Sequence, residues 1–194
     1  MSQFSRPLVV FDLDETLIYC NEKPYRDAQI TTPHGHLSIR DGLEDMLEKI
    51  SDVYDIMVWS TSGKEYIDDM LAIIWPMHIP LVDVFTSAEC GIKSFENVGI
   101  PHYKDMKKII KKHPCYTLDR IAGVDDTPDK YKRNFGNLVS VSRFTGAQDN
   151  ELIRLGDYLI TLSLASSIRK VEKRYWRRVD QGSALSDPEI NKWP

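Results

Sequence analysis

The chain alternates short apolar runs with stretches in which apolar residues recur at helical spacing. Residues 8–11, Leu-Val-Val-Phe, are all apolar, which is typical of a β-strand that is buried on both faces of a sheet. Similar runs predict further strands later in the chain. The predicted strands are residues 8–11, 53–59, 81–85, 121–124 and 138–141.

Apolar residues three and four positions apart predict helices between these strands. The predicted helices are residues 41–51, residues 64–75, one that opens at 102–106, and a long one from residue 149 through 164 and on to 179. Asp41 and Glu44 have the spacing of a capping box at the start of the first helix. Pro76 ends the second helix, because proline cannot continue one.

Basic residues crowd the far end of the predicted last helix. They are Arg169, Lys170, Lys173, Arg174, Arg177 and Arg178. Cations at a helix C-terminus complement the helix dipole, and this explanation suffices for the cluster. The alternative is a site for an anionic partner. Residues 180–194 are polar, and we expect a loose tail there.

A β-hairpin is predicted early in the chain, with strands at 28–32 and 36–40 around a turn of Pro33, His34 and Gly35. The polar residues 19–27 before it are predicted to form a loop. We expect His34 and His36, near the hairpin tip, to be solvated and not to bind metal. Such a hairpin would stand over residues 12–14 as a small cap. Residues 86–101 are predicted to be irregular.

Length and composition indicate one domain at residues 1–179, because 194 residues with 42% hydrophobic content can form a full core. The net charge of −4 argues against a protein that coats nucleic acid in general. Cys20, Cys90 and Cys115 suggest neither a disulfide framework nor a zinc site, and they fit a reducing compartment. No apolar run approaches the roughly 20 residues that span a bilayer. We therefore expect a cytoplasmic protein without a membrane partner.

Acidic residues follow two of the predicted strands directly. Asp12 and Asp14 come after the first strand, and Asp125 and Asp126 come after the fourth. In an open α/β sheet the carboxyl ends of the strands are where ligands bind. Two aspartates this close together repel unless a cation lies between them or one keeps its proton. The alternative for Asp12 and Asp14 is a turn or a helix cap, which are common roles of aspartate pairs.

The stretch Asp-Leu-Asp-Glu-Thr-Leu at residues 12–17 resembles the first motif of the haloacid dehalogenase-like (HAD) phosphatases. The sequence of this stretch most resembles the NLI-interacting-factor-like branch, the small phosphatases that act on the C-terminal domain of RNA polymerase. Three later positions resemble the remaining motifs in the family's order. They are Ser60 for the second motif, Lys104 for the third, and Asp125-Asp126-Thr127-Pro128 for the fourth. Ser60 could equally cap the next helix, and Lys104 could be a solvated charge.

The resemblance implies a three-layer α/β sandwich with a mostly parallel central sheet. It also implies hydrolysis of phosphomonoesters through an aspartyl-phosphate on Asp12, with Asp14 as the general acid and base. Ser60, Thr61 and Lys104 would then bind the transferred phosphate.

The implied cofactor is Mg²⁺, held by Asp12, the backbone carbonyl of Asp14, and the Asp125-Asp126 pair. The substrate class that the resemblance favours is phosphoserine or phosphothreonine protein. A nucleotide or a nucleic-acid end fits the same core, and a phosphate-binding scaffold without turnover is a further alternative.

Overall fold

The computed structural model describes residues 6–95 and 98–178. At its centre lies a sheet whose described strands are β1 (Leu8–Phe11), β5 (Asp55–Trp59), β6 (Leu81–Phe85), β9 (Ile121–Asp125) and β10 (Leu138–Ser140). Their order is β10-β9-β1-β5-β6, and all neighbouring pairs are parallel. The predicted strands and the mostly parallel sheet are confirmed. β1 is central, so its carboxyl end opens onto both neighbouring strands.

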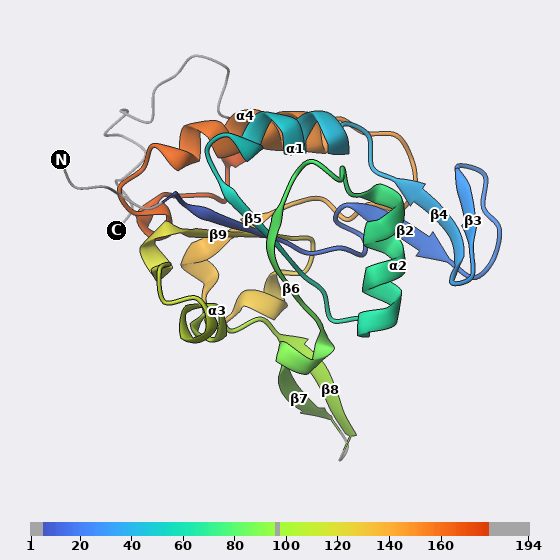
Figure 1. The fold of residues 1–194 in the computed structure, drawn as a ribbon, viewed down its shortest axis with the longest axis horizontal. Helices are drawn as coiled ribbons and strands as arrows, with labels where there is room; N and C mark the ends of the chain where they lie inside the picture. Colours follow the sequence, from blue (N-terminus) through green and yellow to red (C-terminus); the bar gives the residue numbers. More distant parts are fainter. Residues whose placement is uncertain (1–5, 96–97, 179–194) are drawn as a thin grey trace.

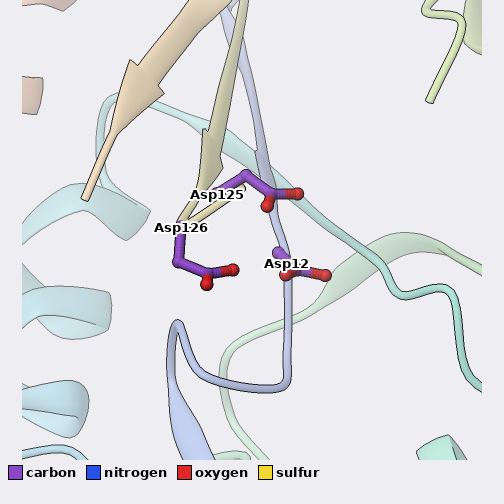
Figure 2. A group of neighbouring side chains, drawn as sticks. All are labelled: Asp12, Asp125 and Asp126. Atoms are coloured by element: carbon purple, nitrogen blue, oxygen red, sulfur yellow. The ribbon is translucent and has the colours of Figure 1, made fainter. Parts of the chain in front are cut away.

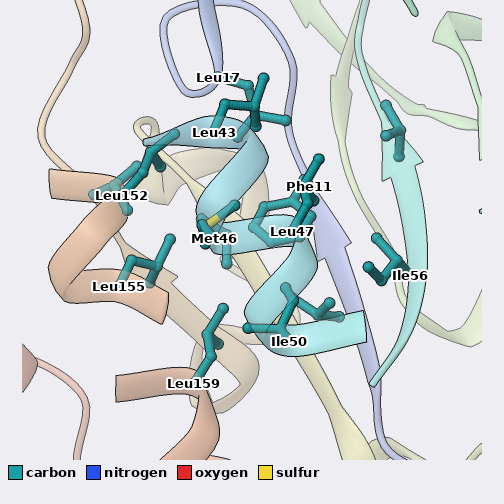
Figure 3. Close-up of a cluster of buried hydrophobic side chains, with 14 of the residues drawn as sticks. Phe11, Leu17, Leu43, Met46, Leu47, Ile50, Ile56, Leu152, Leu155 and Leu159 are labelled. Carbon is teal, nitrogen blue, oxygen red and sulfur yellow. The ribbon is translucent and has the colours of Figure 1, made fainter. Parts of the chain in front are cut away.

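Helices cover both faces of this sheet (Figure 1). One face packs on α1 (Leu43–Ser51), α2 (Lys64–Ile74) and α4 (Glu151–Ser163), and the other face packs on α3 (Lys107–Lys112). The alternation along β1 explains why: Val9 and Phe11 join the first core, while Leu8 and Val10 join the second. In Figure 3, Leu47 of α1 lies beside Phe11, and leucines of α4 belong to the same buried cluster. The predicted three-layer sandwich is confirmed.

The predicted hairpin is present, but it belongs to a larger antiparallel sheet. β3 (Ile30–Thr32) and β4 (Gly35–Ile39) form the hairpin, and β2 (Ile18–Asn21) pairs with the other edge of β4. The prediction of a loop at 19–27 is therefore wrong for its first residues, because pairing with β4 orders them. His34 is not simply solvated, since its Nε2 lies 2.8 Å from Asp69 Oδ2 of α2. This contact joins the hairpin turn to α2.

Residues 86–101 are not irregular as predicted. A 3₁₀ turn at Ser87–Glu89 leads into β7 (Gly91–Phe95), which pairs antiparallel with β8 (Val98–Tyr103). This hairpin projects away from the central sheet in Figure 1. The helix expected to open at 102–106 starts later, at Lys107, because β8 extends to Tyr103. Glycine and proline in this stretch are typical of irregular structure, but β7 and β8 pair directly with each other, with Phe95 opposite Val98.

The last helix ends at Ser163, and its predicted extension to residue 179 is wrong. The chain turns back and forms 3₁₀ turns at Ile168–Lys170 and Trp176–Arg178. Burial explains the turn, because Ile168 and Trp176 are both almost fully buried in the core. The basic residues therefore do not lie at a helix C-terminus, and the dipole explanation for them fails. The predicted tail at 180–194 lies outside the described residues.

The capping box predicted at Asp41 is also wrong. α1 begins after Gly42, whose φ of 76° is left-handed, and no side chain caps it. A Cβ at this position would lie 2.7 Å from Ile153 of α4, so glycine permits both the backbone angle and the close packing of the two helices. None of the described helices has the length and apolar character needed to cross a membrane.

Candidate active site

Three carboxylates meet at the carboxyl ends of β1 and β9 (Figure 2). Asp12 directly follows β1, Asp125 is the last residue of β9, and Asp126 comes next. The two acidic positions lie side by side because Phe11 of β1 pairs with Val124 of β9 in parallel register. One oxygen from each carboxylate lies within 4.8 Å of the others. Hard divalent cations prefer oxygen ligands in such a group, so these residues fit Mg²⁺. The side chain of Asp14 is outside this group, as its predicted role requires.

Lys104 lies between the two buried carboxylates. Its Nζ is 2.6 Å from Asp12 Oδ1 and 2.6 Å from Asp125 Oδ2, and its side chain is 0% exposed. The alternative that Lys104 is a solvated charge is therefore wrong. The lysine follows the last residue of β8, which carries it under the sheet edge. A buried cation between two acids offsets part of the cost of burying their charges.

A second lysine, Lys130, was not predicted. Its Nζ lies 2.8 Å from Asp12 Oδ2 and 3.4 Å from Asp125 Oδ1. It belongs to a 3₁₀ turn at Pro128–Tyr131 that starts directly after the acidic pair. The proline that starts this turn was visible in the sequence, but nothing in the sequence distinguished Lys130 from the neighbouring Lys132.

The two buried carboxylates titrate in opposite directions. Burial opposes the ionisation of Asp12, but the charges of Lys104 and Lys130 outweigh it and hold the pKa of Asp12 below its usual value. Burial, together with the charge of Asp12, raises the pKa of Asp125 to about 6. Asp12 is thus the carboxylate that stays ionised, which is the state that a nucleophile needs.

Asp14 has different surroundings, made of hydroxyl groups. Ser60 Oγ and Ser62 Oγ donate to its Oδ2 at 3.3 and 3.0 Å, and the Tyr66 hydroxyl donates to its Oδ1. Burial raises the pKa of Asp14, and these hydrogen bonds only partly oppose the rise. A carboxyl that holds its proton more tightly than usual is suited to general acid catalysis.

The two predicted phosphate-binding residues that follow β5 are only partly brought to the site. Ser60 contacts Asp14, whereas the half-buried Thr61 makes no hydrogen bond to Asp12 or Asp14 in the described structure. The alternative that Ser60 caps α2 is wrong, because Gly63 is the N-cap and no side chain caps that helix. Ser62 and Tyr66 were missed. Both follow Ser60 closely in the sequence, Ser62 in the loop before α2 and Tyr66 in the first turn of α2, and the fold brings both hydroxyls to Asp14.

The loop that follows Asp14 is tightly tied to the fourth motif. Glu15 has a left-handed φ of 61°, which is uncommon for a residue other than glycine. Thr16 Oγ1 accepts a hydrogen bond of 3.2 Å from the backbone N–H of Asp126. Arg143 pairs with Glu15 and lies 3.9 Å from Asp126. These contacts hold the ends of β1 and β9 at a fixed separation.

Comparison with known families identifies the family of this chain. The model of the NLI interacting factor-like phosphatases matches residues 7–171. The chain belongs to this family. The predicted membership of the HAD phosphatases, and of this branch, is confirmed.

Curated relatives are distant but cover most of the chain. CTD small phosphatase-like protein 2 of Dictyostelium discoideum is 23% identical over 83% of this chain and 28% of its own length. Nuclear envelope morphology protein 1 of Saccharomyces cerevisiae is 24% identical over 84% of this chain and 40% of its own length. The chain therefore spans less than half the length of either relative.

Solved structures share the fold. The RNA polymerase II CTD phosphatase Fcp1 of fission yeast, bound to beryllium fluoride, has a TM-score of 0.55 at 21% identity over 72% of this chain and 42% of its own. A haloacid dehalogenase-like hydrolase of Streptococcus pneumoniae has a TM-score of 0.53 at 11% identity over 79% of this chain and 98% of its own. The HAD-like fold that the resemblance implied is confirmed.

Four of the basic residues of the C-terminal segment line a pocket of about 530 Å³ beside β10: Arg169, Lys170, Lys173 and Arg174. Arg169 and Lys170 are exposed there, while the buried Lys173 donates to the backbone oxygens of Ile168 and Val171 at 2.6 Å. Burial lowers the pKa of Lys173 to about 8. A site for an anionic partner in this segment stays a prediction.

Proposed function

We propose that this protein is a Mg²⁺-dependent phosphomonoester hydrolase that works through an aspartyl-phosphate on Asp12. One observation carries the proposal. Asp12 is buried and ionised between two ammonium groups, while Asp14, one residue away, is held outside the acidic group by hydroxyls. The two aspartates thus have the separate surroundings that a nucleophile and a proton carrier need.

In the proposed reaction, Asp12 attacks the phosphorus, and the bond to the leaving oxygen breaks as Asp14 gives that oxygen its proton. Asp14, now ionised, takes a proton from a water molecule that attacks the aspartyl-phosphate. This step releases phosphate and restores Asp12. Ser60, Thr61 and Lys104 bind the equatorial oxygens and stabilise their charge as the bonds change.

The acidic group supplies the metal site in this proposal. Asp12, Asp125 and Asp126, with the backbone carbonyl of Asp14, would hold Mg²⁺, which neutralises charge on the transferred phosphoryl group when it is bound. Asp126 adds a negative charge beside Asp125, and this should strengthen divalent binding.

The substrate class that we propose is phosphoserine or phosphothreonine protein. The names of the relatives support it, since CTD phosphatases occur both among the curated sequences and among the solved structures. We further propose that the protein acts in the cytoplasm.

The proposal is tested by hydrolysis of an aryl phosphate with Mg²⁺ and with chelator. Turnover should require Mg²⁺, and Asp12→Asn should abolish both turnover and covalent labelling by a phosphorus-labelled substrate. Asp68→Asn is the matched control, because it makes the same change at an exposed pair on α2. Full activity in chelator, or in Asp12→Asn, contradicts the mechanism. A scaffold would bind phosphopeptides and release no phosphate.

The same assay assigns the substrate class. Phosphopeptides, nucleotides and 3′-phosphorylated oligonucleotides are compared by kcat/KM at one salt concentration. We expect phosphoserine and phosphothreonine peptides to have the highest values. A higher value for the oligonucleotides would replace protein with nucleic acid as the proposed substrate.

A further inference from the structure

The ammonium group of Lys130 lies beside carboxylate oxygens that the proposed reaction assigns to metal binding. Lys104 faces Asp12 Oδ1 and Asp125 Oδ2, and Lys130 faces Asp12 Oδ2 and Asp125 Oδ1. Each of the four oxygens of the two carboxylates therefore has an ammonium group beside it. The catalytic steps above use Lys104 to bind phosphate oxygens and assign Lys130 no contact with the substrate.

The backbones of the two lysines are joined directly. The N–H of Lys104 donates to the backbone oxygen of Lys130 at 2.9 Å, and the N–H of Lys130 donates to Thr127 O at 3.1 Å. Lys130 is thus anchored at its Cα while its four-carbon side chain reaches the acids. Its position depends on the same turn that follows Asp125 and Asp126.

A divalent cation and the Lys130 ammonium cannot both keep these positions. Mg²⁺ binds oxygens at about 2.0–2.1 Å and demands a regular octahedral shell. An ammonium on the same Asp12 oxygen crowds that shell and repels the ion electrostatically. Of the two lysines, Lys130 is the one that can move away from the acids. Its side chain is 13% exposed and its Nζ lies 3.4 Å from Asp125 Oδ1, whereas the side chain of Lys104 is 0% exposed.

We propose that Lys130 is a built-in counter-cation that pairs with Asp12 and Asp125 in the metal-free protein and is displaced when a divalent metal binds. The inference rests on the metal site of the proposed function. Two consequences follow. Lys130 lowers the affinity of the acidic group for metal, and it stabilises the protein when metal is absent, since like charges at Asp12 and Asp125 would otherwise repel across the site.

The first test compares Lys130→Met with the wild type by titration calorimetry with Mg²⁺. Methionine keeps the length of the side chain and removes the charge, so the Kd for Mg²⁺ should fall about 5- to 150-fold, the range of coupling between interacting sites. The metal-free melting temperature should fall, and saturating Mg²⁺ should restore it. Lys130→Arg keeps the charge and should retain weak binding.

Lys132→Met is the matched control. Lys132 is exposed in the same segment, and its Nζ lies over the Tyr103 ring, 4.2 Å from the centroid. It tests whether any lost positive charge in this segment tightens binding. An equal gain in affinity in both variants would overturn the inference, as would an unchanged or larger Kd in Lys130→Met.

A second measurement uses the wild type and does not depend on a variant that folds. Lysine acylation followed by mass spectrometry should modify Lys130 slowly without metal and faster with Mg²⁺, while Lys104 stays protected. Equal modification of Lys130 in both conditions contradicts displacement. These results separate the two proposals, because a wild type that hydrolyses phosphate with Mg²⁺ but shows no displacement refutes only the role of Lys130.

Discussion

Asp12 and Asp14 are one residue apart and have opposite surroundings. Asp12 lies beside the ammonium groups of Lys104 and Lys130, while Asp14 accepts hydrogen bonds from the hydroxyls of Ser62 and Tyr66. The lysine charges lower the pKa of Asp12, whereas burial raises the pKa of Asp14 in spite of its hydroxyl donors, so the two pKa values move apart. The assignment of nucleophile and acid follows from this difference.

The division of labour predicts a specific defect in Asp14→Asn. Proton transfer is worth on the order of 10²–10⁴-fold in rate, so the loss should be that large for phosphoserine, whose leaving oxygen needs a proton. It should be smaller for nitrophenyl phosphate. Because water activation also fails, the variant should accumulate acid-stable, hydroxylamine-labile label after a burst. Equal slowing of both esters without trapped label would remove Asp14 from the acid and base role.

The elements around the site are joined by a buried cation outside the catalytic group. Arg40, directly after β4, donates to Asp149 Oδ2 at 2.8 Å and to the backbone oxygen of Thr16 at 2.9 Å. Its side chain is 0% exposed. Asp149 in turn accepts from the N–H of Glu151 at the start of α4. One guanidinium thus holds together the small antiparallel sheet, the loop after Asp14 and the last helix.

Arg40→Met should destabilise the fold by about 3 kcal/mol, the lower end of the range for breaking a buried ion pair. Denaturant unfolding measures this change. Lys64→Met, at the exposed Lys64–Asp68 pair of α2, is the control and should change stability by less than about 0.5 kcal/mol. A double-mutant cycle of Arg40→Met with Asp149→Asn should give a clear coupling energy. Additive effects would mean that the pair does not join these elements.

At the scale of the whole molecule, a metal ion and a proton compete for the carboxylate of Asp125 at the carboxyl edge of the sheet. Burial of β1 and β9 on both faces raises the pKa of Asp125 to about 6, with the charge of Asp12 adding to the effect. A carboxylate must lose its proton before it binds metal. Metal binding therefore depends on how the entire sandwich encloses this residue.

The affinity for Mg²⁺ should consequently depend on pH. Below about pH 6, Asp125 is protonated in the metal-free protein, so Kd should rise about tenfold for each unit that the pH falls. Above pH 6, where Asp125 is already ionised, this contribution should level off. Calorimetric titrations between pH 5 and 8 measure the profile. Asp125→Asn should remove the dependence along with most of the affinity, and an unchanged slope in that variant would assign the proton to another group.

The sequence by itself determined the central strands and the acids that follow them. Residues 8–11 and 121–124 are apolar runs that end in aspartates, and parallel strands place their carboxyl ends at one edge. Asp12, Asp125 and Asp126 could therefore be predicted to lie together, because each follows or ends an apolar strand of the same parallel sheet. The motif resemblance added Lys104 and Ser60, which the structure also brings to Asp12 and Asp14.

Only the tertiary structure decided the second lysine, the hydroxyls around Asp14 and the end of α4. Lys130 and Asp12 are 118 residues apart, and their contact depends on the turn after β9 and on the backbone bond between Lys130 and Lys104. α4 stops at Ser163 because Ile168 and Trp176 return to the core, although the local pattern still favours a helix. Burial and pairing between distant segments outweigh local preference at these positions, because a single chain segment carries no record of its distant partners.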